Sequence, residues 1–130
     1  MTGFIVKRSV STNLEETLAN FSNALSNEGF GVLYKLDFTE IIAGKTGHRL
    51  KDHIVGLGVC IPGLASQVLE VDATMAALLP CGAFVAETPE GTTVGFLDPQ
   101  AALGLTNNSA LEPLGAEVKA RLERTLTALP

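Results

Sequence analysis

The chain has 130 residues, of which 46% are hydrophobic and 18% charged, so it predicts one folded domain and not a disordered segment. Its net charge of −5 disfavours nonspecific binding to nucleic acid or to an anionic membrane, because an acidic surface repels phosphate groups. Only 5% of the residues are aromatic and none is tryptophan, which leaves little surface on which bases could stack.

The sequence also predicts no membrane anchor. Its first residues contain a short apolar run, Phe4 to Val6, before two basic residues follow. No run approaches the ~18 apolar residues that a membrane span needs. We therefore expect a cytoplasmic protein in which both cysteines are reduced thiols.

The first part of the chain predicts a strand, a helix and a second strand. Residues 4–9 read as the first strand, and a capping box of Thr12 and Glu15 starts a helix that ends near Gly29. The helix carries one apolar stripe, made of Leu14, Leu18, Phe21 and Leu25. Apolar residues then alternate with smaller or polar ones over residues 30–38, as a half-buried strand with one apolar face requires.

A polar loop is expected at residues 44–53, after a helical turn at residues 39–43. The loop holds both histidines, His48 and His53, and three of the nine basic residues. This composition is typical of a solvated connection, and the alternative is an anion-binding or pH-sensitive lid. It is not a Walker A phosphate loop, because the upstream glycine of that motif is missing.

Residues 54–59 predict a strand that is covered on both faces, because the run is apolar, rich in β-branched residues and too short for a helix. Glycines within it, such as Gly58, mark places where another backbone or a ligand comes close. Pro62 suits the first turn of a helix that runs to about residue 71. Cys60 therefore lies at a strand-to-helix junction.

The rest of the chain predicts a short helical piece, a hairpin and a final helix. Asp72 can cap a helical piece at residues 73–79. Strands at 82–87 and 92–97 flank a turn, and Asp98-Pro99 opens a short helix. A second capping box, Ser109 with Glu112, starts a final amphipathic helix that spans about residues 110–128.

These elements predict a single α+β domain over residues 1–130. Their order is β-α-β-β-α-β-β-α, with an antiparallel sheet that is packed on one face by the two long helices.

Both cysteines of the chain, Cys60 and Cys81, fall at the junction around Pro62. One hypothesis is a noncatalytic protein that binds a small apolar or mixed ligand in the concavity of the sheet, with these three residues at its mouth. Glycines such as Gly58 would leave the room, although close packing of helix and sheet explains them equally well.

A second hypothesis is thiol redox or sulfur-transfer chemistry by Cys60 and Cys81. Cys60 precedes a helix amino terminus, where the helix dipole lowers a thiol pKa below its usual value of ~8.5. Against this, the cysteines lie 21 positions apart and form no Cys-x-x-Cys motif, and free cysteine is often buried.

A third hypothesis is a metal or haem site built from the cysteines with His48 or His53. The number of ligands suits zinc, but their spacing matches no zinc pattern, so we expect no metal and no cofactor. Catalytic motifs such as Gly-x-Ser-x-Gly and His-Glu-x-x-His are missing as well. The sequence thus leaves enzyme activity undecided and favours its absence, and a structural or regulatory homodimer remains as a further alternative.

A set of short motifs resembles a known family. The motifs are Gly29-Phe30-Gly31 after an amphipathic helix, then Cys60-Ile61-Pro62, Leu79-Pro80-Cys81 and Asp98-Pro99. They resemble the domain of unknown function 302 family of small bacterial and archaeal proteins, over about residues 4–103. Ile61 stands where the family pattern has Asn, which implies an altered site if that Asn makes a polar contact.

The resemblance implies a fold like that of the TATA-box-binding protein, with a curved antiparallel sheet and helices on one side. It also implies that the protein often pairs as a homodimer. It implies no activity and no DNA binding, because function lives in sites and not in folds.

Overall fold

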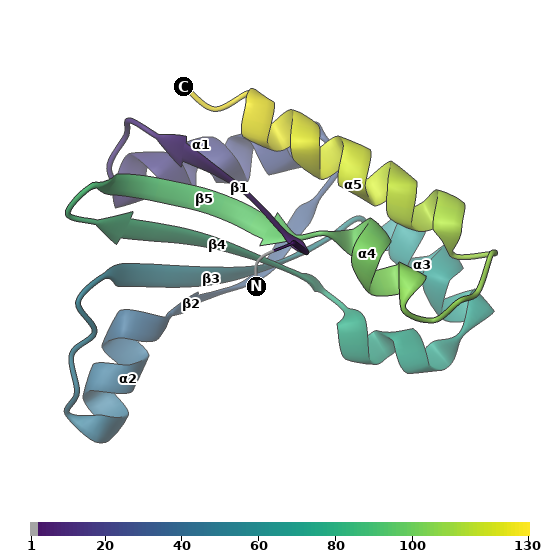
Figure 1. Ribbon diagram of the computed structural model, residues 1–130, viewed down its shortest axis with the longest axis horizontal. Coiled ribbons are helices and arrows are strands. Elements are labelled where there is room, and N and C mark those ends of the chain that lie inside the picture. Colours follow the sequence, from purple (N-terminus) through teal and green to yellow (C-terminus); the bar gives the residue numbers. More distant parts are fainter. Residues whose placement is uncertain (1–2) are drawn as a thin grey trace.

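A computed structural model describes residues 3–130 and shows one five-stranded antiparallel sheet, with the strand order β1-β5-β4-β3-β2. The strands are β1 (Ile5–Val10), β2 (Gly31–Asp37), β3 (His53–Cys60), β4 (Cys81–Thr88) and β5 (Gly91–Leu97). The two long helices, α1 (Leu14–Asn27) and α5 (Glu112–Thr127), cover one face of this sheet (Figure 1). The predicted fold class is therefore confirmed.

The shorter helices lie at the two ends of the sheet (Figure 1). At one end, α2 (Phe38–Thr46) connects β2 to β3. At the other end lie α3 (Pro62–Val71), the 3₁₀ helix η1 (Ala73–Leu78) and α4 (Pro99–Gly104). None of the helices within residues 3–130 combines the length and the apolar composition needed to cross a membrane.

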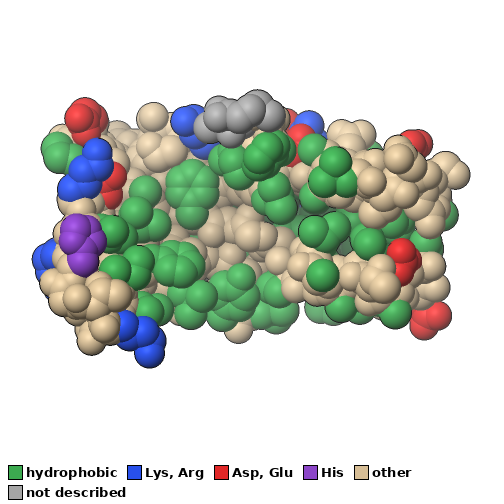
Figure 2. Space-filling model, turned by 60° about the horizontal axis from the view of Figure 1, so that its bottom comes forward, with side chains coloured by type: hydrophobic (Ala, Val, Ile, Leu, Met, Phe, Trp, Pro, Cys, Tyr) green, Lys and Arg blue, Asp and Glu red, His purple; other side chains and the backbone are tan. Residues whose placement is uncertain are grey.

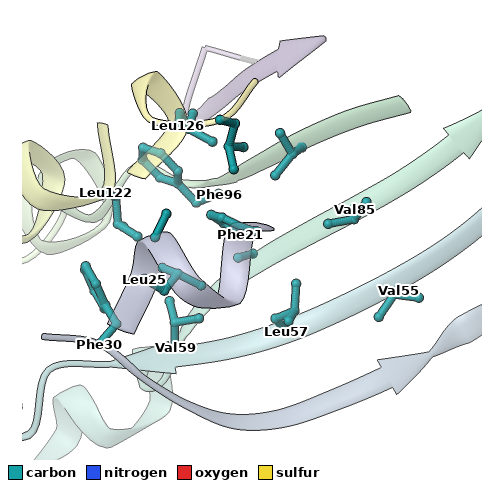
Figure 3. Close-up of a cluster of buried hydrophobic side chains, with 14 of the residues drawn as sticks. Phe21, Leu25, Phe30, Val55, Leu57, Val59, Val85, Phe96, Leu122 and Leu126 are labelled. Carbon is teal, nitrogen blue, oxygen red and sulfur yellow. The ribbon is translucent and has the colours of Figure 1, made fainter. Parts of the chain in front are cut away.

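The main core lies between the sheet and the two long helices (Figure 3). Phe21 and Leu25 of α1 and Leu122 of α5 are fully buried against the strands. Their partners on the sheet are Leu57, Val59, Val85, Val94 and Phe96. Each such side chain contributes about 1.5–3 kcal/mol through burial, so this layer supplies much of the stability of the fold.

Both predicted capping boxes are wrong. Asn13, not Thr12, caps α1: its Oδ1 accepts from the backbone N–H of Glu16 at 2.9 Å, while the Thr12 hydroxyl bonds Thr17. The α5 helix has Leu111 at its cap position and no side-chain cap. A backbone contact within the preceding turn replaces the expected Ser109 side chain, and Pro113 then fixes the first helical turn.

The pairing of β2 departs from simple alternation. Val32 pairs with Val59 and Tyr34 pairs with Gly58, so Leu33 is an extra, bulged residue. Because the bulge adds one residue, the side chains that follow it lie on the opposite face of the sheet. Tyr34 therefore points away from the helix-covered face, to which Val32 contributes. The expected single apolar face of residues 30–38 is therefore divided between the two faces of the sheet.

The helical turn and the polar loop also differ from the expectation. The α2 helix starts at Phe38, within the predicted strand, because Asp37 caps it by accepting from the N–H of Glu40 at 3.1 Å. It runs on to Thr46 and ends at Gly47, which has a positive φ of 76°. The predicted loop is therefore shortened from both ends, since His53 already belongs to β3.

Within residues 3–130, no helix layer covers the second face of the sheet, which we call the open face. The side chains of Tyr34 and Phe84 point to this face, and Gly56 and Gly58 belong to it. Figure 2 shows many hydrophobic side chains on this side of the molecule. Side chains of the chain itself fill the space above the two glycines of β3, whereas the space above Gly82 of β4 is open. The Phe38 ring lies over Gly56, and the rings of Tyr34 and Pro80 lie over Gly58. These two glycines therefore leave no room for a ligand, contrary to the expectation.

Candidate functional site

An apolar cavity lies where β3 and β4 end and the chain passes through α3 and η1. Its volume is about 40 Å³. All of its lining side chains are aliphatic, aromatic or thiol groups, and both cysteines are among them. A cavity of this kind is expected to be dry, because water needs two or more polar partners.

Local structure explains why the two cysteines meet here. Cys60 is the last residue of β3, and Cys81 is the first residue of β4, where it pairs in register with Val59. The intervening chain leaves the sheet at Pro62 and returns at Pro80, so that α3 and η1 close over the two strand ends.

A polar contact fixes the opposite wall of the cavity. Asp98 caps α4 by accepting from the N–H groups of Gln100 and Ala101, and it forms an ion pair with Lys119 of α5 at 2.8 Å. Burial tends to raise the pKa of Asp98, but hydrogen bonds from Lys119 and from these backbone groups outweigh it and hold the pKa below its usual value. The ionised carboxylate therefore holds α4, and with it Ala102, against α5.

The two thiols are free and poorly ionised. Burial raises the pKa of Cys60 above its usual value, and it raises the pKa of Cys81 from 9.0 to about 11, with a smaller effect from the neighbouring Cys60. The prediction that the α3 dipole lowers the pKa of Cys60 is therefore wrong, because loss of hydration dominates. At neutral pH the cavity is lined by neutral thiols.

Comparison with known proteins identifies the family. The model of the domain of unknown function DUF302 matches residues 6–129. The chain belongs to the DUF302 family. Its structure is similar to the crystal structure of an uncharacterized conserved DUF302 protein from Bacillus stearothermophilus, with a TM-score of 0.93. The two chains are 31% identical over 98% of this chain and 99% of the other. No curated protein matches the sequence.

Only part of the predicted site of this DUF302 protein comes together. Cys60 and Cys81 line the same cavity, whereas Pro62 begins α3 on the exposed surface and is not part of the lining. Gly58 belongs to the open face, under the rings of Tyr34 and Pro80. The cysteine site is therefore a small, partly open apolar cavity at the edge of the core and not a concavity of the sheet.

The histidines lie far from the cysteines. His53 and Cys60 are the two ends of β3, which places their backbones roughly 23 Å apart at ~3.3 Å per residue. His53 Nε2 contacts Asp37 Oδ2 at 2.7 Å, while His48 is exposed in the loop after α2. A metal site shared by cysteines and histidines is thus wrong for this fold.

The surroundings of His53 form a polar network. Its ring nitrogen, Asp37 and Glu40 offer ligand atoms within 4.8 Å of one another. Each carboxylate already has a partner, since Asp37 caps α2 and Glu40 pairs with Arg49 at 2.9 Å. Burial tends to raise the pKa of Asp37, but hydrogen bonds from His53 and from the Glu40 N–H keep it below its usual value. These contacts connect the end of β2 to the start of β3.

Several lining residues could not be found from the sequence. Leu97, Ala102 and Val118 reach the cavity from β5, α4 and α5. They are ordinary small or branched hydrophobic residues, and each follows the apolar pattern of its own element. Only the packing of α4 and α5 against the cysteine junction gives them a place in the site.

Proposed function

We propose that this DUF302 protein is a noncatalytic protein that binds a small, uncharged, apolar molecule in the cavity at the cysteine junction. The observation that supports this proposal is the cavity itself, whose lining is entirely apolar and includes both thiols of the chain. Apolar surface with few polar groups is typical of small-molecule sites.

The chemistry of the lining restricts the ligand. A charged or strongly polar molecule would lose its hydration on entry and find no hydrogen-bond partner among these side chains, at a cost of several kcal/mol. The raised pKa values of Cys60 and Cys81 keep the thiolate fraction small, so nucleophilic or redox catalysis is disfavoured relative to binding. Two free thiols also fit a reducing compartment, which is consistent with our expectation of a cytoplasmic protein.

Xenon binding tests the site, because xenon occupies dry apolar cavities and needs no specific recognition. We expect ¹²⁹Xe NMR to detect a bound fraction in the native protein and the xenon-induced shifts to concentrate on residues that line the cavity. Ala102→Leu should abolish this signal by filling the cavity, since Ala102 is part of the lining. Ala101→Leu is the matched control, because Ala101 is exposed on the same helix.

Native mass spectrometry of untagged protein is the complementary measurement. Extra mass that disappears in Ala102→Leu but persists in Ala101→Leu would identify a bound molecule at this site. Equal xenon binding by both variants would place the binding elsewhere and contradict the proposal.

We propose in addition that two copies of the chain pair through the open face. This face exposes large hydrophobic side chains, including Tyr34, Leu36 and Phe38, which are each about two-fifths exposed. The side chains that β3 and β4 direct to it between Ile54 and Gly58, and between Gly82 and Ala86, are all uncharged. The exposed Lys7 lies beside Gly95 at the β1 edge of the same face, so the uncharged area is the part formed by β3 and β4. Two chains of net charge −5 repel each other least where such uncharged surfaces meet.

The dimensions of the open face fit a second copy. Five strands at ~4.8 Å spacing, with about seven residues each, give a face on the order of 450 Å². A stable interface buries ~800 Å² per partner, so the face alone supplies about half. The α2 and η1 helices project on the same side of the sheet and could supply the remainder (Figure 1).

A further inference from the structure

We propose that residues 62–79, which comprise α3 and η1, form a lid that opens as a unit to admit the ligand. This inference rests on the proposed ligand site, and it explains how such a site can be filled. The cavity measures about 40 Å³. A cavity that holds benzene measures about 150 Å³, so an organic molecule enters only if one wall moves.

Within residues 3–130, the lid has one polar attachment to the rest of the chain, the hydrogen bond from the Ala65 N–H to the carbonyl of the adjoining residue Ile61. Its backbone contacts beyond regular helix hydrogen bonds run from Ala65 to Ile61 and among the residues from Val68 to Leu79. Its side-chain hydrogen bonds join Gln67 to Gly63 and Thr74 to Asp72, again within the lid. No ion pair among the described residues involves it. Opening therefore breaks no hydrogen bond or ion pair to another part of the described chain apart from the Ala65–Ile61 bond at the hinge.

Apolar contacts alone hold the lid closed, and they are few. Val68 is its one buried hydrophobic residue, and it packs with Leu103 and Leu111 in a small cluster separate from the main core. Met75 and Leu78 pack against the same cluster and are only partly buried. Segments with little buried apolar surface open locally at a lower free energy than the core. The lid therefore opens while the sheet stays folded.

Thiol labelling of the unliganded protein tests the lid without any ligand. Cys81 should react slowly with excess iodoacetamide at mildly alkaline pH, with the modified residue identified by peptide mass mapping. Val68→Ala should raise the Cys81 rate roughly tenfold, because it removes most of the buried anchor of the lid. Val85→Ala is the matched control, since Val85 is fully buried in the main core and not in the lid cluster.

Urea unfolding measures the global stability of each variant, and this value distinguishes local opening of the lid from complete unfolding as the cause of faster labelling. The proposal requires Val68→Ala to accelerate labelling more than Val85→Ala does at an equal or smaller loss of global stability. It is overturned if both variants accelerate labelling in proportion to their global destabilisation, because the additional exposure of the half-buried Cys81 would then come only from complete unfolding.

Native-state hydrogen exchange of the unmodified protein is the second measurement, and it holds even if Val68→Ala fails to fold. The amides of Ala65 to Val71 should exchange together and well before those of β3 and β4. The lid proposal is overturned if the amides of α3 and those of β3 and β4 exchange with the same opening free energy. In that case xenon binding would still report on the cavity, so failure of the lid and failure of the ligand site are distinguishable.

Discussion

The ring of Phe38 lies directly over the α-carbon of Gly56, so that a β-carbon at Gly56 would sit 2.5 Å from Cε2 of Phe38. Gly56 is in the middle of β3 and Phe38 is the first residue of α2. This pair shows how the chain buries a central strand that has a helix layer on one face only. The aromatic ring of a neighbouring element takes the place of the missing layer.

Gly56→Ala should destabilise the protein by about 1–3 kcal/mol, because the added methyl group forces the Phe38 ring off the sheet. Urea unfolding measures the loss. Gly82→Ala is the matched control, since no atom of the described residues beyond its chain neighbours lies within 4 Å of a β-carbon at Gly82 on β4. If the Phe38 ring causes the loss, Gly56→Ala should cost less in a Phe38→Ala background. Equal effects of the two alanine substitutions would contradict this account.

Cys81 should make stability fall in alkaline solution. Its pKa is about 11 in the folded protein against 9.0 when unperturbed, so the unfolded chain loses this proton first as the pH rises. The folded state then holds more protons than the unfolded state between pH 9 and 11, and the free energy of unfolding decreases across that window. Urea unfolding of Cys81→Ala should lack this component, and an unchanged pH dependence would rule it out.

Asp98 should contribute stability that is lost in acid. Its folded pKa lies below the unfolded value, so its contribution is complete above the unfolded pKa of ~3.9 and disappears as the pH falls through the folded pKa. Asp98→Asn should cost about 1–2 kcal/mol at neutral pH through the weakened cap of α4 and the lost pair with Lys119. Its unfolding curves should approach those of the native protein in acid. Parallel curves at every pH would contradict the assignment.

Leu36→Glu should shift the protein from dimer to monomer in sedimentation velocity, because it places a charge within the open face of each copy. Leu36 is 37% exposed on β2. Leu105→Glu is the control: Leu105 is 84% exposed at the end of α4 and lies outside the sheet. A monomer in the native protein, or equal dissociation by both variants, would exclude the open face as a dimer interface.

The sequence predicted features that depend on residues close together in the chain, and it missed features that depend on residues far apart. Local patterns were sufficient for β3, for the proline that starts α3, and for the caps at Asp72 and Asp98, because each depends on residues a few positions apart. Capping at α1 was misplaced by one residue, since Thr12, Asn13 and their neighbours offer two similar local patterns. The bulge at Leu33 was missed because the pairing with β3 creates it.

The sequence by itself determined the class of the fold and the strand-to-helix junction at Cys60. Tertiary structure alone decided that Cys60 and Cys81 share a cavity, that this cavity excludes Pro62 and both histidines, and that aromatic rings cover the glycines of β3. The physical reason is that periodicity and capping act between near neighbours in the chain. The cavity and the thiol pKa values depend instead on desolvation by segments that are distant in sequence.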